Sequence, residues 1–449
     1  LMLTFQESVS LFIKTFVKPF ESPEKLHKGS SGRIAFIGGC DEYIGAPSFA
    51  ALSSLFLGCD YAYVLCLSNP NPIRMLCPDA VVIEMKKLYE IAREFEFQES
   101  GISSSDFFGL SSRVYPTINA LRVNALSIGS GLGRSLAAKV MLYTCMKVAQ
   151  HKRIPMVVDG DGITLLCDMV RDGWLEFPIK NVDITLTPNF RELLALCIVS
   201  KIFESDEIRK DDHKKRSVED IFKEFMNISS QTFSLSQAVS TSGDAEILSS
   251  LDDRLKDACS LITKLCKLTN CSILSKGAID IVCVKEPVKF SATKSTAPSV
   301  SDSPVCRTPS KQPKQPVPSL EQMIAHDRDF EIVCKPVYSL KSPCRAAGQG
   351  DIIAGAVSTV LASLNAIKVR QDVFPDEISK RFGGLACASI LVSIAAVLTY
   401  HKYSIGLTTS DILKSFKFAG KTVEKVSKSS VAFPTPFSSL FKYFNDAVE

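Results

Sequence analysis

The chain has 449 residues, of which 46% are hydrophobic, so it can build one large α/β domain or two ordinary ones. Its 52 lysines and arginines against 48 acids leave a net charge of +4, too balanced for nucleic acid or a membrane surface to be the main partner. The 15 cysteines form no CxxC pair and no spacing typical of metal ligands. We therefore expect buried free thiols in a reducing compartment, and a cytoplasmic location without excluding an organellar fraction.

The N-terminal segment, residues 1–25, is amphipathic but contains Glu7 and lacks the small-residue cleavage site of a signal peptide. It resembles a transit peptide only weakly. Short apolar strands then alternate with longer helical segments. The strands are expected at 32–39, 61–67, 124–133, 155–162, 182–189 and 271–284, and the first helices at 46–58 and 137–150. This alternation predicts a three-layer α/β/α fold in which helices cover both faces of a mainly parallel sheet.

Two segments interrupt the alternation. Residues from about 200 to 256 are charged and then rich in serine, and residues 286–328 are dense in serine, proline, lysine and glutamine. The second is too polar to bury a core and is expected to be disordered. Both are interpreted as insertions in a single domain spanning residues 26–445.

No membrane-spanning helix is expected. The apolar run at residues 385–400 is shorter than the roughly 20 residues that a bilayer span needs. Its alanines and serines favour a tightly packed core helix.

Glycines and acids recur in the loops that follow the expected strands. These loops are GGCDEYIGAP (38–47), GSGLGR (129–134), DGDG (159–162), TPNFRE (187–192) and SKGAID (275–280). In parallel sheets ligands bind beyond the carboxyl ends of the strands, where all these loops would lie. Each loop alone is explained as well by a tight turn or a helix cap, and GSGLGR lacks the GxGxxG spacing.

The stretch CRAAGQGDIIAG, residues 344–355, precedes a helix that is apolar nearly all round. Gly348 and Gly350 permit close approach of another group to the backbone, and the helix N-terminus attracts anions. Asp351 at this point is consistent either with a helix cap or with a general base beside an anion hole.

In this order, the motifs GRIAFIGGCDEYIGAP, IGSGLGRS, VVDGDG, LTPNFRE, SKGAIDIV and RAAGQGDIIAGA resemble the ATP-dependent (S)-NAD(P)H-hydrate dehydratases of the ribokinase-like superfamily. The resemblance covers most of residues 26–200 and 265–420. It implies a ribokinase-like fold and ATP-dependent removal of water from hydrated NADH or NADPH. The implied steps are phosphorylation of the ring hydroxyl and loss of phosphate.

The resemblance also implies roles for individual residues. Asp351 would be the base, with Gly348 and Gly350 forming the anion hole. The hydrated cofactor would contact Tyr43, Ala46, Gly133, Asn189, Phe190, Arg191, Glu192, Leu193, Leu194, Ala195 and Asp351. ATP would contact Lys276, Gly277, Ala278, Ile279, Asp280, Lys341, Ser342, Pro343, Cys344, Arg345, Ala346, Ala347, Gly348, Gln349 and Gly350. Mg²⁺ is expected to accompany ATP, with no protein ligand assigned, and a homo-oligomer is compatible with the family.

The chain departs from the family pattern at several positions. Ser130 stands where a proline is usual, Gly160 where an alanine is, and Ala347 where a second glycine is. Phe190 and Arg191 replace smaller or acidic residues. The methyl group of Ala347 lies beside the expected anion hole, so this departure puts the phosphate position in doubt.

Two alternatives share the same nucleotide motifs. One is a ribokinase-like kinase acting on a vitamin precursor, and the other is a non-catalytic nucleotide-binding protein whose insertions recruit partners. The loops at 38–47 and 187–195 favour the dehydratase, and the retained Asp351 favours an active enzyme. The motifs do not separate ATP from ADP, or NADH hydrate from NADPH hydrate.

Overall fold

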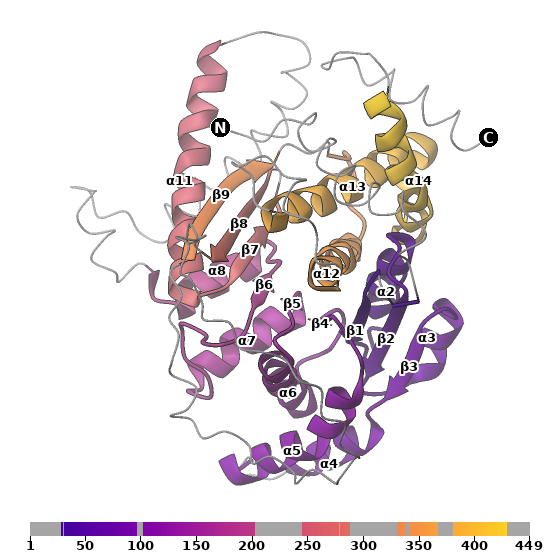
Figure 1. The fold of residues 1–449 in the computed structure, drawn as a ribbon, viewed down its shortest axis with the longest axis vertical. Coiled ribbons are helices and arrows are strands. Elements are labelled where there is room, and N and C mark those ends of the chain that lie inside the picture. The colour runs from indigo at the N-terminus through magenta and orange to yellow at the C-terminus, as the bar shows by residue number, and fades with distance from the viewer. Residues whose placement is uncertain are drawn as a thin grey trace, which may run out of the picture.

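The computed structural model describes residues 28–29, 31–96, 102–202, 245–277, 279–287, 330–337, 341–366 and 380–428. Within them lies a nine-stranded sheet of order β3-β2-β1-β4-β5-β6-β7-β8-β9 (Figure 1). The strands are β1 Arg33–Ile37, β2 Tyr61–Cys66, β3 Val81–Glu84, β4 Ala125–Ile128, β5 Met156–Val158, β6 Ile184–Leu186, β7 Ser272–Ser275, β8 Asp280–Pro287 and β9 Phe330–Val337. The strands from β1 to β7 pair in parallel, whereas β8 and β9 pair antiparallel. The predicted α/β fold with a mainly parallel sheet is confirmed.

Helices cover both faces of the sheet (Figure 1). One layer holds α4 Lys86–Glu96, α5 Ser104–Ala120, α6 Leu136–Lys152, α7 Asp161–Arg171, α8 Phe190–Val199 and α11 Ala245–Thr269. The other holds α2 Gly45–Phe56, α12 Gln349–Ala366, α13 Lys380–Tyr403 and α14 Thr409–Lys428. The short helix α3, Pro70–Leu76, lies beside the edge strand β3.

The strands are apolar at successive positions because the residues on each face of the sheet pack against a layer of helices. In β1, Ala35 and Ile37 pack toward α6, whereas Ile34 and Phe36 pack toward α2. Alternate strand residues point to opposite faces, so a strand covered on both sides turns neither face to solvent. This packing holds the carboxyl ends of neighbouring strands at one edge of the sheet.

Helix α13 is longer than its uncharged run suggested. It starts at Lys380, and the segment Lys380–Gly406 is long and apolar enough to cross a membrane by length and composition alone. The apolar part of this helix is fully buried against the rest of the protein, with α12 and α14 as its main neighbours. The expectation of a tightly packed core helix is confirmed.

Regular secondary structure reaches into both segments that were expected to be insertions. The first was expected to reach residue 256, but α11 already begins at Ala245, and Leu255 is buried in its packed part. The second was expected to start at 286 and end at 328, yet β8 continues to Pro287. Residues 1–27, 203–244, 288–329 and 429–449 lie outside the described residues, so the expected disorder of 288–329 remains a prediction.

The segment 288–329 joins two paired strand ends, because Pro287 and Phe330 are Cα partners in the β8–β9 ladder. We predict that a short glycine-rich turn can replace it without loss of folding. Shortening the loop should stabilise the domain by roughly 1–2 kcal/mol at most, because closure entropy grows slowly with loop length. Urea unfolding measures this. A control deletion extended to residues 282–335 removes the buried Val282 and Val284 and should unfold the edge of the sheet; equal damage from both deletions would contradict the prediction.

Candidate active site

The glycine- and acid-bearing loops meet at the carboxyl ends of neighbouring strands. β1, β4, β5, β6 and β7 are adjacent in the sheet, and the loops that follow them carry the motifs identified in the sequence. The two loops after β1 and β4 touch directly, since Gly39 N–H donates to the Gly131 carbonyl over 3.0 Å. A Cβ on Gly131 would lie 2.7 Å from Cβ of Tyr43 and 3.1 Å from Cβ of Ala46. The predicted substrate residues Tyr43 and Ala46 therefore lie against the glycine loop.

Asp351 lies in the first turn of α12, where the helix meets this edge of the sheet. Among the described residues, the hydrogen bond to its carboxylate comes from the Ser130 side chain and not from a backbone N–H, which disfavours the interpretation as a helix cap. Burial and the neighbouring Asp159 carboxylate raise the pKa of Asp351 to about 7, although a hydrogen bond from Ser130 opposes the shift. A carboxylate with this pKa exchanges its proton readily near neutral pH, as a general base must.

The start of α12 also presents backbone donors. No acceptor among the described groups takes the N–H of Gly348 or Gly350, whereas the Asp351 and Ile352 N–H groups both reach the Gly348 carbonyl. Gly348 has φ +97°, and a Cβ there would lie 3.0 Å from the Phe49 ring. The free N–H groups and the helix dipole together make this end attractive to an anion.

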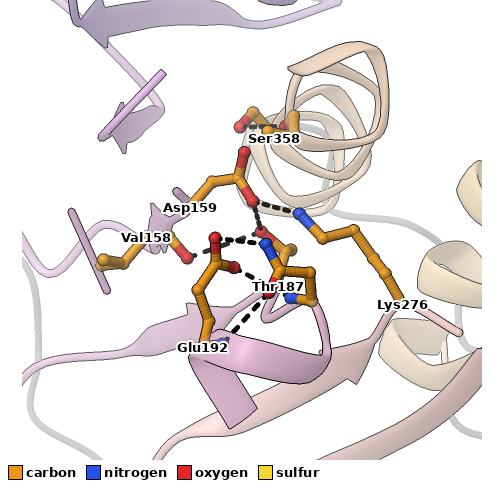
Figure 2. Close-up of polar contacts among 8 residues, drawn as sticks. Val158, Asp159, Thr187, Glu192, Lys276 and Ser358 are labelled. Atoms are coloured by element: carbon orange, nitrogen blue, oxygen red, sulfur yellow. Dashed lines mark hydrogen bonds and ion pairs between the residues drawn. The ribbon is translucent and has the colours of Figure 1, made fainter. Parts of the chain in front are cut away.

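Lys276 places a positive charge among the carboxylates of the site (Figure 2). Its ammonium pairs with Asp159 Oδ1 at 2.5 Å, and the two side chains are only 14% and 5% exposed. A Cβ on Gly350 would lie 3.2 Å from Lys276 Nζ, so the ammonium also borders the start of α12. Burial lowers the pKa of Lys276, but Asp159, Glu192 and Asp351 more than offset it, and the net shift is upward. Lys276 is therefore a stable cation beside Asp351.

Asp159 is itself held in place by Thr187, whose hydroxyl donates to the same Oδ1 over 2.6 Å (Figure 2). Asp159 follows β5, Thr187 follows β6 and Lys276 follows β7. Three adjacent strands thus deliver one buried network. The roles of Asp159 and Thr187 were not predicted from the sequence, because a tight turn explains the DGDG motif equally well.

The predicted substrate segment 189–195 forms the start of α8. Asn189 caps the helix and shares a reciprocal capping box with Glu192, the Asn189 N–H donating to Glu192 Oε2 over 2.8 Å. Burial raises the pKa of Glu192, and Lys276 partly opposes that shift. Asn189 and Arg191 are exposed, as a ligand surface requires. The Leu193 side chain is 1% exposed and lies in the core. It therefore packs α8 against the domain and does not face the loops at the edge of the sheet.

Gly133 shapes the glycine loop through its backbone conformation, and its N–H is already hydrogen-bonded within the protein. It has φ +73°, and its N–H donates to Asp161 Oδ2 over 3.0 Å. Oδ1 of Asp161 also lies 3.5 Å from Nε of Arg134, whose positive charge balances that carboxylate. The carboxylate of Asp161 therefore fixes the glycine loop to the start of α7.

Asp280 clamps the expected ATP segments to one another. Its buried carboxylate accepts from Lys341 Nζ over 2.9 Å, from the Gly277 N–H over 2.9 Å and from the Ser389 hydroxyl. Burial raises the pKa of Asp280, but these three donors outweigh it, and the net shift is downward. Arg345 adds a bond to the Gly277 carbonyl over 3.1 Å. The β7–β8 turn and the segment leading to α12 are thereby joined.

The remaining residues of the expected ATP segment lie along the approach to α12. Ser342 is buried and accepts from the Cys344 N–H over 3.3 Å, while Pro343 and Ala347 are exposed. The Ala347 carbonyl accepts from Thr409 Oγ1, so the backbone here is fixed to α14. Ile279, Ala346 and Gln349 are partly exposed, and Ala278 lies outside the described residues.

The chain is similar to known proteins. A family model described as NAD(P)H-hydrate dehydratase matches residues 34–228. An ATP-dependent (S)-NAD(P)H-hydrate dehydratase of Arabidopsis thaliana is 27% identical over 411 residues, covering 90% of this chain and 82% of that protein. The chain is therefore similar in sequence to the NAD(P)H-hydrate dehydratases.

Other proteins of this description are more similar over a shorter range. Proteins of the same description from Physcomitrium patens and Neurospora crassa are 36% and 37% identical over 179 and 182 residues. These matches cover 39% and 38% of this chain and 48% of each relative, so the chain matches about half the length of these two relatives.

A solved structure shares the fold. A hypothetical protein of Streptococcus mutans superposes with a TM-score of 0.51 at 16% identity, covering 93% of this chain and 99% of that one. This similarity confirms the three-layer α/β/α fold with a mainly parallel sheet that the sequence predicted.

Proposed function

We propose that this protein removes water from the S epimer of hydrated NADH or NADPH at the expense of ATP, and so restores the reduced nicotinamide cofactor. The observation that carries the proposal is Asp351. It lies at the open N-terminus of α12 with its pKa raised to about 7, beside the buried Lys276–Asp159 pair. The reaction class is that of the proteins to which the chain is similar.

In the first step Asp351 accepts the proton of the ring hydroxyl. The O–H bond breaks, the oxygen forms a bond to the γ-phosphorus of ATP, and ADP leaves with the electrons of the broken O–P bond. In the second step the ring C–O bond breaks and phosphate leaves, while the lone pair of the ring nitrogen forms the new π bond. Loss of a ring proton then completes the dihydronicotinamide.

The charges of the site are suited to transfer of the phosphoryl group. The negative charge that develops on the phosphoryl oxygens would meet the N–H groups of Gly348 and Gly350 and the dipole of α12. Lys276, whose raised pKa keeps it protonated, adds a cation at the same place. Its pairing with Asp159 fixes the ammonium between the strand ends and the helix.

The clamp around Asp280 would orient ATP. Lys341 and Arg345 bring two cations to the β7–β8 turn, and both are tied to it by the contacts already described. No trio of His, Cys, Asp or Glu side chains in the described ranges is arranged to hold a metal ion. We infer that Mg²⁺ reaches the site on the phosphates of ATP, whose charge it neutralises, as is usual for this ion.

Product stoichiometry tests the proposal. Purified protein with ATP, Mg²⁺ and hydrated NADH should release one ADP and one inorganic phosphate for each dihydronicotinamide recovered. A ribokinase-like kinase acting on a stable alcohol would instead keep the phosphoryl group on its product. ADP formation from hydrated NADH without release of phosphate would reject the dehydratase.

The pH dependence of kcat/KM should follow Asp351. The carboxylate must be ionised to accept a proton, so kcat/KM should rise with pH and level off above the pKa of about 7. Ser130→Ala removes a hydrogen bond that lowers this pKa, so its acidic limb should move to higher pH. Ser112→Ala, on the exposed face of α5, is the control and should leave the profile unchanged. Superimposable profiles for Ser130→Ala and the unmodified protein would show that Ser130 does not act on the base.

A further inference from the structure

Four cysteines from distant parts of the chain gather where α11 crosses the last two strands. Cys259 and Cys266 lie on α11, Cys283 on β8 and Cys334 on β9. Cys283 and Cys334 are Cα partners in the antiparallel ladder. The Cys334 thiol donates to the Cys259 carbonyl over 3.5 Å, a contact between residues 75 positions apart. The thiols of Cys266 and Cys334 both hydrogen-bond the thiol of Cys283. This thiol cluster, Cys259, Cys266, Cys283 and Cys334, takes no part in the proposed reaction.

The members of the thiol cluster differ in exposure. Cys266 and Cys283 are 1% and 0% exposed within the core, whereas Cys259 and Cys334 are partly exposed. A reagent from solution therefore meets Cys259 and Cys334 first. No group of His, Cys, Asp or Glu in the part of the chain that the structure describes is placed to hold a metal ion, which argues against a metal centre here.

We propose that Cys259 and Cys334 form a dithiol modification site, which a small-molecule disulfide oxidises to a disulfide bond between α11 and β9. The contact of Cys334 with the backbone of Cys259 places the two residues side by side, on elements that pack against each other. Among the four thiols the first nucleophile is Cys334. Hydrogen bonds from the Cys259 and Cys283 thiols, with one from Thr263, lower the pKa of Cys334.

The reaction proceeds by two exchange steps. The Cys334 thiolate attacks one sulfur of the small disulfide, which forms a mixed disulfide and releases one small thiol. The Cys259 thiol then loses its proton and attacks the Cys334 sulfur, releasing the second small thiol. In total, the two protein thiols are oxidised to one disulfide bond, and the small disulfide is reduced to two thiols.

The test uses the full-length, fully reduced protein and oxidised glutathione as the probe. After incubation, remaining thiols are alkylated and the digested protein is mapped by mass spectrometry. We expect one linked peptide pair joined through Cys259 and Cys334, which disappears after reduction with dithiothreitol. Cys259→Ser should leave glutathione on Cys334 as a persistent mixed disulfide, since the resolving thiol is gone.

Cys145→Ser supplies the control, because Cys145 is fully buried on α6, away from the cluster, and its loss should leave the linked pair unchanged. Mapping of the unmodified protein decides the question even if a cluster variant fails to fold. A bond between Cys283 and Cys334, glutathione retained on the unmodified protein without a link, or alkylation of Cys259 and Cys334 at undiminished yield would each overturn the proposal.

Discussion

Asp351→Asn is expected to lower turnover of hydrated NADH about 10²- to 10⁴-fold, the range that loss of a general base produces. Asparagine has nearly the same shape but cannot accept the hydroxyl proton. The N–H groups of Gly348 and Gly350, the Lys276 ammonium and the clamp around Asp280 all remain, so ATP should bind with nearly unchanged affinity. Steady-state kinetics and an ATP titration of the same preparation measure both effects.

Asp168→Asn is the matched control, since Asp168 lies on α7 in a partly exposed pair with Arg171. It should leave turnover within about twofold of the unmodified protein, as loss of a surface pair has little energetic effect. If Asp351→Asn turned over substrate as fast as this control, Asp351 would not be the base.

The same variant should be more stable than the unmodified protein at neutral and higher pH. The folded-state pKa of Asp351 is about 7, against an ordinary value of 3.8. Between these values the folded protein binds more protons than the unfolded chain, so the free energy of unfolding falls as the pH rises. Above about pH 7 the ionised carboxylate therefore costs stability, on the order of 1 kcal/mol after allowance for solvent, and asparagine removes that cost. Urea unfolding of both proteins at about pH 4 and pH 8 should show the difference only at the higher pH.

Lys276→Met is expected to be the most damaging single change to stability at the site. It leaves the Asp159 carboxylate buried without a balancing positive charge and removes the cation that balances Glu192 and Asp351. Breaking one side of a buried ion pair costs about 3–5 kcal/mol. The pKa of Asp351 should also rise further, because Lys276 lowers it, so any remaining activity should need higher pH.

The double variant Lys276→Met with Asp159→Asn should recover part of the lost stability, because no buried charge is then left unpaired at that position. Lys139→Met is the control. Its partner Asp172 is 44% exposed, and its loss should cost less than about 1 kcal/mol. A Lys276 variant no less stable than the Lys139 variant would contradict the placement of this pair in a buried network.

The sequence was sufficient for the strand and loop pattern. Apolar strands with glycines and acids at their ends predict a parallel sheet and the edge where a ligand binds. The helix after Asp351 was correctly expected to be buried, since it offers no polar face. These features are local, and the residues that carry them are close together in the chain.

Features that depend on distant contacts were not predictable from the sequence. The Lys276–Asp159 pair joins residues 117 positions apart, and only the adjacency of β5, β6 and β7 brings them together. Strand β9 follows a long polar segment that hides its pairing with β8. The start of α11 reads as part of a charged and serine-rich insertion because residues 245–256 themselves carry serines and several charged side chains.

The orientation of individual side chains was also beyond the sequence. Residues 189–195 were expected to line the site as a set, but a helix turns its residues to different sides. Asn189 and Arg191 are exposed, whereas Leu193 is in the core. Helical periodicity indicates that the segment has two faces, but it does not show which face meets the ligand.

The most direct test of the account is an assay of cofactor repair. Protein, ATP, Mg²⁺ and the hydrated S epimer of NADPH are mixed, and the return of the dihydronicotinamide absorbance is followed for the unmodified protein and for Asp351→Asn. We predict that the absorbance returns only when ATP is present and that Asp351→Asn nearly abolishes this return. Both proteins should bind ATP equally. Recovery without ATP, or no recovery by a folded protein that binds ATP, would contradict the account.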